Sequence, residues 1–153
     1  MHIEESKRVL RNTQLFQDLN DSHLDLILMI CEEKNCRAGE VIFHQDDPGA
    51  ALYIVARGEV EIYLEPEQPG DEPVQLAILE ENATFGETIL VEAGRRSAGA
   101  RSHTDAQLLR IPRQQMVKLM SDYPEIGFRI LRRMAADLTA KLRSANEQIR
   151  DRQ

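Results

Sequence analysis

The spacing of apolar residues divides the 153-residue chain into a helical beginning, a strand-rich middle and a helical end. From residue 3 to about residue 33, apolar residues recur at helical spacing, which predicts helices with a cap at residues 20–22. From residue 34 to about residue 112 they form short alternating runs, which predicts strands. The helical period then returns at residues 114–121 and in a long helix opened by Pro124. We expect the parts 1–33, 34–112 and 113–153 to form one domain.

The middle part contains several short runs of alternating apolar residues. The apolar residues of these runs are Val41 and Phe43; Leu52 and Ile54; Val60, Ile62 and Leu64; Val74, Leu76 and Ile78; and Leu109 and Ile111. Turn residues at 46–49 and 57–58 separate these runs, as does a loop at 65–73 with three prolines and four acidic residues. Many short strands at this spacing predict a small barrel or a double-sheet roll.

The last helix has a narrow apolar seam with alternating steps of four and three residues. The seam consists of Leu131, Ala135, Leu138, Leu142, Ala145 and Ile149. Such a heptad pattern fits either a helix packed on its own sheet or one strand of a two-stranded coiled coil. We favour a homodimer through this helix, because the stripe continues to the end of the chain, where little sheet is left to cover.

Composition and charge exclude several functional classes. The formal net charge is −7 and the pI is about 5.1, which argues against a non-specific nucleic-acid binder. No apolar run approaches the ~20 residues of a membrane-spanning helix, and no signal-peptide pattern begins the chain, so we expect a cytoplasmic protein. Two cysteines and four histidines without metal-ligand spacing predict neither a metal site nor a disulfide.

Residues 85–98, FGETILVEAGRRSA, combine a sharp turn with two charged residues suited to binding a ligand. A helical turn starting at Glu87 after Gly86 would offer N–H groups to an anion, and Arg96 could bind a phosphate bidentately. A carboxylate at Glu87 fits this arrangement if it accepts hydrogen bonds from a sugar hydroxyl. The combination points to a phosphate joined to a ribose, while the alternative is an ordinary turn with a surface cation.

Two motifs in the correct order make the chain, from about Gln14 to Arg143, resemble the cyclic nucleotide-binding domain family. These are residues 42–58, IFHQDDPGAALYIVARG, and the phosphate-binding cassette at 85–98. The resemblance implies an eight-stranded β-roll with flanking helices, which is a mainly β fold. It also implies that Glu87 holds the ribose 2′-hydroxyl and Arg96 the cyclic phosphate. By the same resemblance, Ser97 and Ala98 contact the phosphate, and Gly86 and Thr88 form the start of the cassette helix.

The chain departs from the family pattern at several positions. Asp46 stands where the first hairpin usually has glycine, Thr88 replaces an apolar residue, and Ile89 replaces a small one that borders the phosphate pocket. Ile89 either crowds that pocket or points into the core. The Thr-Ser pair that contacts adenine in the catabolite activator branch is missing, since Lys141 and Leu142 occupy its places.

The candidate base contacts on the long helix are Thr139, Lys141 and Arg143. Ser97 suits cyclic AMP or cyclic GMP, and the resemblance of the domain to bacterial members of the family favours cyclic AMP. We expect no other cofactor.

Transcription factors of this family continue into a helix-turn-helix, whereas this chain stops at Gln153, so no DNA-binding module is expected. We expect Arg129, Arg132 and Arg133 to form a solvated face or a subunit contact. We therefore expect a regulatory module, not an enzyme, that acts in trans on an unknown downstream protein through a ligand-dependent shift of its last helix. The alternative is a degenerate fold that serves as a dimerisation or docking scaffold without nucleotide.

Overall fold

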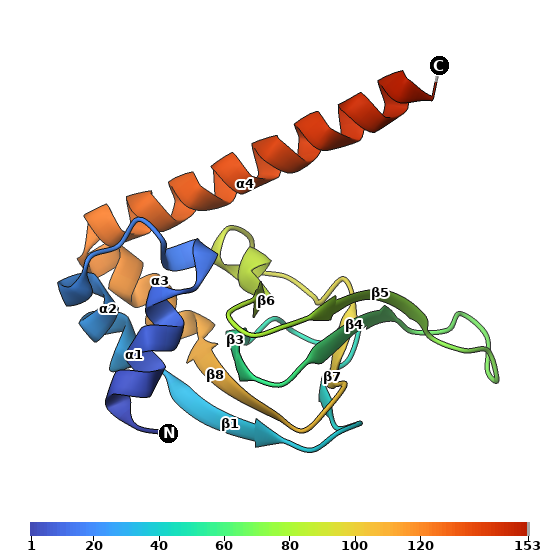
Figure 1. Ribbon diagram of the computed structural model, residues 1–153, viewed down its shortest axis with the longest axis horizontal. Coiled ribbons are helices and arrows are strands. Elements are labelled where there is room, and N and C mark those ends of the chain that lie inside the picture. Colours follow the sequence, from blue (N-terminus) through green and yellow to red (C-terminus); the bar gives the residue numbers. More distant parts are fainter. Residues whose placement is uncertain (153) are drawn as a thin grey trace.

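The computed structural model describes residues 1–152. They form two antiparallel four-stranded sheets, and helices precede and follow the strands in the sequence (Figure 1). The strands are β1 (Glu32–Cys36), β2 (Val41–Phe43), β3 (Ala51–Arg57), β4 (Val60–Leu64), β5 (Val74–Leu79), β6 (Thr84–Phe85), β7 (Gly99–Ser102) and β8 (Ala106–Pro112). The helices are α1 (Ile3–Arg11), α2 (Asp21–Leu28), α3 (Arg113–Asp122) and α4 (Pro124–Asp151), with short 3₁₀ turns η1 (Gln14–Phe16) and η2 (Glu87–Leu90). One sheet has the order β1-β8-β3-β6 and the other β2-β7-β4-β5. The predicted double-sheet β-roll with flanking helices is therefore confirmed.

Strand β3 separates the two hydrophobic cores of the molecule. Its first six residues are all buried. Leu52 and Ile54 belong to the core beneath the helices, whereas Tyr53 and Val55 belong to the core inside the roll. Because both faces of β3 are covered, the strand is continuously apolar instead of alternating with polar residues.

Strands β1 and β7 lie where the sequence has no alternating apolar run. Strand β1 begins at Glu32, inside the part expected to be helical, and only its last residue, Cys36, is buried. It pairs with β8 along its whole length, from Glu32 opposite Arg110 to Cys36 opposite Ala106. Strand β7 pairs with both β2 and β4. Pairing with strands distant in sequence, and not local apolar pattern, determines these two strands.

Helix α2 begins at the predicted cap. The Asn20 side chain accepts a hydrogen bond from the His23 backbone N–H at 2.9 Å, and the His23 ring Nδ1 accepts one from the Asn20 N–H at 3.2 Å. This reciprocal arrangement is a capping box in which histidine replaces the usual Glu or Gln. The cap lies in the predicted range, at residues 20–22.

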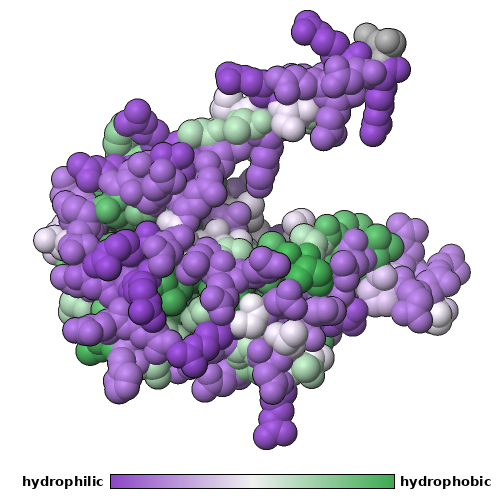
Figure 2. Space-filling view, viewed as in Figure 1, coloured by the Kyte–Doolittle hydropathy of each residue, from purple (hydrophilic) through white to green (hydrophobic). Residues whose placement is uncertain are grey.

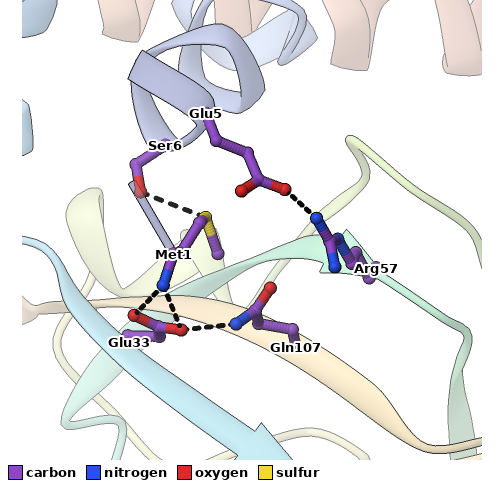
Figure 3. Close-up of polar contacts among 6 residues, drawn as sticks. All are labelled: Met1, Glu5, Ser6, Glu33, Arg57 and Gln107. Carbon is purple, nitrogen blue, oxygen red and sulfur yellow. Dashed lines mark hydrogen bonds and ion pairs between the residues drawn. The ribbon is translucent and has the colours of Figure 1, made fainter. Parts of the chain in front are cut away.

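Polar contacts attach α1 to the first sheet (Figure 3). The Met1 ammonium donates to both carboxylate oxygens of Glu33 on β1 at 3.1 Å, and the Gln107 amide on β8 donates to the same carboxylate. Glu5 on α1 forms an ion pair with Arg57 at the end of β3. These contacts bring the first helix against three strands that lie far apart in sequence.

Helix α4 is anchored over its first half only. Ile126 and Ile130 are fully buried, and Arg133 donates to both carboxylate oxygens of Asp18 at 3.1 Å. Arg129 donates to the Asp18 backbone oxygen at 3.2 Å. Two members of the basic cluster, Arg129 and Arg133, thus contact Asp18 of the same chain at the surface, and the expectation of a solvated face or a subunit contact stays a prediction.

The second half of α4 projects away from the β-roll, as Figures 1 and 2 show. Every residue from 138 to 152 is exposed, including Leu138 at 59%. The alternative that this part of the seam packs on its own sheet is therefore wrong. Pairing of the seam with a second chain stays a prediction.

Candidate functional site

A cavity of about 220 Å³ lies at the turn between β6 and the segment that leads to β7. Strands β2, β4 and β6, the turn η2 and residues 94–98 form its walls. All six predicted ligand-binding residues line it: Gly86, Glu87, Thr88, Arg96, Ser97 and Ala98. The fold thus brings together both ends of the segment that the sequence singled out.

Backbone hydrogen bonds hold the first hairpin loop against the cassette. The Arg96 N–H donates to the Asp47 carbonyl oxygen at 2.7 Å, and the Asp46 N–H donates to the Arg96 carbonyl oxygen at 2.8 Å. The Gly49 N–H donates to the Gly94 carbonyl oxygen at 2.9 Å. The two sequence motifs therefore form one structural unit, although residues 59–84 separate them in the chain.

The Arg96 guanidinium is buried beneath this cavity without an acidic partner. The residue is 6% exposed, and its side chain donates to the carbonyl oxygens of Gly86 and Ala51. Its guanidinium carbon lies 4.1 Å from the centre of the Phe43 ring, a cation–π contact. Its Nε has no hydrogen-bond partner, and no ion pair to Arg96 occurs within residues 1–152.

Burial lowers the pKa of the Arg96 guanidinium, because removal from water disfavours its charged form. A buried cation ordinarily has a counterion. Arg96 instead has two neutral carbonyl oxygens and an aromatic face, so an anion entering the cavity would supply the missing negative charge.

Gly86 makes room for the Arg96 side chain. It has a left-handed backbone with φ of 75°, and a Cβ at this position would lie 2.5 Å from Nη1 of Arg96. The following turn η2 is a 3₁₀ helix of four residues that begins at Glu87. The short helical turn expected after Gly86 is therefore present.

Glu87 is half-buried, whereas Thr88 and Ser97 are exposed. Within the described part of the chain, no hydrogen bond or ion pair involves the Glu87 carboxylate. All three side chains border the cavity and are available to a ligand. Their roles toward a nucleotide stay predictions.

A second and larger cleft, of about 1100 Å³, separates α4 from the β-roll (Figure 2). It shares Thr84, Glu87, Thr88 and Glu92 with the first cavity, so the two spaces meet at η2. Of the candidate base contacts, only Lys141 lines this cleft. Thr139 and Arg143 do not line it, and the Thr139 hydroxyl donates to the Ala135 carbonyl oxygen of its own helix at 2.8 Å.

The departures from the family pattern have simple structural consequences. Asp46 has φ of 71°, so it adopts the backbone that glycine usually provides. Ile89 borders the cavity, but its side chain is buried in the core and packs against Gly49, where a Cβ would lie 2.3 Å from Ile89 Cγ2. Of the two readings of Ile89, the structure favours the core.

Phe43 is a site residue that sequence reasoning missed. Its ring lies beneath the Arg96 guanidinium and within 6.0 Å of the rings of Tyr53 and Phe85. In the sequence it is one apolar member of an alternating run, which predicts only a strand. No sequence signal links it to a cation 53 residues later in the chain.

Residues 1–152 contain neither a cluster of metal-ligating side chains nor a helix able to span a membrane. No three His, Cys, Asp or Glu side chains in this range come together in a way that could hold a metal ion. No helix of this range has the length and apolarity needed to cross a membrane.

The molecule is thus an antiparallel β-roll in which a buried cation without an acidic partner borders a small cavity, as expected of a protein that binds an anionic ligand. The sequence pattern of the cyclic nucleotide-binding domain matches residues 33–123. The chain therefore belongs to the cyclic nucleotide-binding domain family, and the resemblance inferred from the two motifs is confirmed.

Similar proteins include bacterial receptors and regulators. The cyclic AMP receptor protein of Thermus thermophilus is 32% identical over 137 residues, which are 90% of this chain and 61% of that protein. The crystal structure of the Thermus thermophilus catabolite activator protein has a TM-score of 0.74 at 32% identity, covering 90% of this chain and 62% of that chain. The N-terminal domain of a transcriptional regulator from Streptomyces coelicolor A3(2) has a TM-score of 0.76 at 28% identity, covering 87% and 94%. The chain thus spans about three fifths of the length of the Thermus receptor.

Proposed function

We propose that this chain is a receptor for cyclic AMP. The phosphate binds to Arg96 with help from Ser97 and the Ala98 backbone, and the ribose 2′-hydroxyl donates to Glu87. The base extends from the small cavity into the cleft beneath α4, where Lys141 is its nearest predicted contact. Two observations support this path: all of these groups border the connected spaces, and the spaces meet at η2.

The observation on which the proposal depends is the unpartnered Nε of Arg96. Burying a guanidinium that lacks a carboxylate partner is costly, because neutral acceptors compensate only part of the lost hydration. An anion that accepts from this guanidinium removes the unsatisfied donor and neutralises the charge. A cyclic phosphate carries one negative charge and several acceptor oxygens, so it matches a site with one cation and neighbouring hydroxyl groups.

Cyclic AMP is preferred to cyclic GMP in this proposal because of the similar proteins. The relative that is 32% identical is named a cyclic AMP receptor protein. The residues near the base do not decide the choice, since the adenine-contacting pair is replaced by Lys141 and Leu142. Binding of both nucleotides must therefore be compared directly.

The proposed role of the ligand is regulatory and not catalytic. Binding at η2 would shift α4, because this helix forms one wall of the cleft, and the module would act in trans on a downstream protein. The exposed seam of α4 supports a homodimer through this helix, since isolated apolar stripes of this length are usually covered. A coupling free energy of about 1 to 3 kcal/mol between ligand and helix position is typical of such switches.

Calorimetry on protein cleared of co-purified nucleotide tests the binding site. We expect cyclic AMP to bind at micromolar or tighter affinity, with weaker binding of cyclic GMP and none of 5′-AMP. Arg96→Ala should weaken binding by at least about 100-fold, since hydrogen bonds to charged groups contribute about 1.5 to 3 kcal/mol each. Glu87→Ala should weaken it by about tenfold.

The control variant is Arg37→Ala, because Arg37 is an exposed arginine away from both cavities. Arg96→Lys is a second probe, which keeps the charge but loses the planar fork. Circular dichroism shows whether each variant is folded. Unchanged affinity in folded Arg96→Ala would refute the phosphate site, and no nucleotide binding to the wild type would favour the scaffold alternative.

Sedimentation tests the proposed dimer. Replacing Leu138 and Leu142 together by glutamate should give a monomer, because each charge would face its symmetry copy in the seam. Ile3→Glu is the control, since Ile3 is an exposed apolar residue on α1. A dimer that persists in the double variant would show that the interface lies on another surface of the chain.

A further inference from the structure

Strand β5 forms an open edge of the second sheet. It pairs only with β4, and the sheet order β2-β7-β4-β5 ends with it. Within residues 1–152, its backbone makes no hydrogen bond outside that pairing. A strand at a sheet edge has unpaired N–H and C=O groups that can bind another extended segment.

The composition of β5 offers no protection against such pairing. Natural edge strands usually contain lysine, proline or an inward-pointing charge, whereas β5 has the sequence VQLAIL without any charged residue or proline. Val74 is 57% exposed and Leu76 is 53% exposed. In Figure 2 apolar surface is visible on the roll beneath the projecting helix, the side on which Figure 1 shows β5.

Acidic residues flank this apolar edge at both ends. Glu67, Asp71 and Glu72 precede β5, and Glu80 and Glu81 follow it. Residues 58–94 contain no lysine or arginine but ten acidic residues, whereas the whole chain has a net charge of only −7. In this segment only Glu61 and Glu65 form ion pairs, with Arg101 and His44, within the described part of the chain.

The charges also disfavour pairing of β5 with its own copy. Antiparallel pairing of two β5 strands would place the acids before one strand beside those after the other, and like charges opposite each other destabilise a sheet. A segment with basic residues at its ends would instead meet opposite charge at both ends.

From this arrangement we propose that β5 is a docking edge for another protein, whose contribution is an extended segment with an alternating apolar core and basic ends. The main-chain groups of β5 supply affinity, Val74 and Leu76 supply apolar contact, and the flanking acids select the charge of the partner. This inference does not rest on nucleotide binding, and nucleotide is therefore left out of its test.

A labelled synthetic peptide tests the proposal. Its core alternates valine and threonine, and lysines occupy both ends; a control peptide has the same core with glutamate ends. We expect the basic peptide to bind in fluorescence anisotropy, with affinity falling as salt is raised, and to slow hydrogen exchange of the amides in 74–79. Failure of the basic peptide to bind, or equal binding of both peptides, would overturn the proposal.

Variants at the two edges of the same sheet locate the binding. Leu76→Lys should weaken the basic peptide at least about tenfold, because a lysine on an edge strand opposes further pairing and repels the lysine ends. The matched control is Val41→Lys on β2, the opposite edge, which should bind as the wild type does. Equal effects of the two variants would place the site elsewhere.

A charge reversal separates selection by charge from simple apolar contact. In the double variant Glu72→Lys and Glu80→Lys, the five flanking acids become three acids and two lysines, so the preference for the lysine-ended peptide should become much smaller. An unchanged preference would show that the acids do not select the partner and would overturn that part of the proposal.

Discussion

Replacing Gly86 with alanine tests how tightly the cassette backbone positions Arg96. Gly86 has φ of 75°, and an added Cβ would lie 2.5 Å from Arg96 Nη1 and 3.3 Å from the Ala51 carbonyl oxygen. The guanidinium would have to leave its two acceptor oxygens, on Gly86 and Ala51, or the turn would have to open. Either response disturbs the cation on which the proposed phosphate site depends.

The expected loss has two parts. Alanine in a left-handed backbone costs about 1 to 2 kcal/mol. Weakening two hydrogen bonds from a charged group, each contributing about 1.5 to 3 kcal/mol, adds a further loss that relaxation reduces to about 1 to 3 kcal/mol. Gly86→Ala should therefore lower the free energy of unfolding by about 2 to 5 kcal/mol.

Gly39→Ala is the matched control. Gly39 has φ of 86°, but nothing lies within 4 Å of an added Cβ, so only the backbone cost of about 1 to 2 kcal/mol applies. Urea denaturation gives the free energy of unfolding of both variants, and calorimetry gives their affinity for cyclic AMP. Equal losses of stability would refute the inference that Gly86 makes room for Arg96, and unchanged affinity in Gly86→Ala would refute the role of that positioning in binding.

Three further predictions concern packing, pH and the anchoring of α4. Gly49→Ala would place a Cβ 2.3 Å from Ile89 Cγ2, so denaturation should show a loss of about 1 to 3 kcal/mol, and this loss should be smaller when it is measured in an Ile89→Ala background; an equal loss in both backgrounds would contradict this contact. Burial raises the pKa of Cys31 from 9.0 to about 12, so between these pH values the unfolded state loses a proton that the folded state keeps. In this pH range the free energy of unfolding should fall by up to about 1.4 kcal/mol per pH unit. If it falls equally steeply with pH in the wild type and in Cys31→Ala, the raised pKa of Cys31 is refuted. Asp18→Asn removes the carboxylate that Arg133 binds, so hydrogen exchange in the first half of α4 should become faster, and unchanged exchange would show that core packing alone holds the helix.

Local chemistry made several elements predictable. The cap at Asn20 and the opening of α4 by Pro124 are properties of a few adjacent residues, and both lie as predicted. The runs around Leu52, Val60 and Leu109 mark strands because apolar residues of these types favour a buried, extended backbone. Gly86 was predicted at a sharp turn because glycine tolerates a left-handed backbone, and its φ of 75° agrees with this prediction.

Other elements depend on partners distant in sequence. Strand β1 is mostly polar and exists because it pairs with β8, and the Phe43 ring becomes a site residue only because the roll places it under Arg96. The contacts of Arg129 and Arg133 with Asp18 likewise join residues more than 100 positions apart in the chain. None of these relations can be read from residues that are neighbours in the chain.

The sequence by itself determined the strand-rich middle and the flanking helices, because periodicity and turn chemistry are local properties, and the resemblance of two motifs to a known family implied the β-roll and the cassette with its charged residues. Only the tertiary structure decided that Arg96 is buried without an acid, that Ile89 belongs to the core, and that β5 is an open edge. The physical reason is that burial, counterions and free strand edges depend on which surfaces meet, and folding brings those surfaces together across the whole chain.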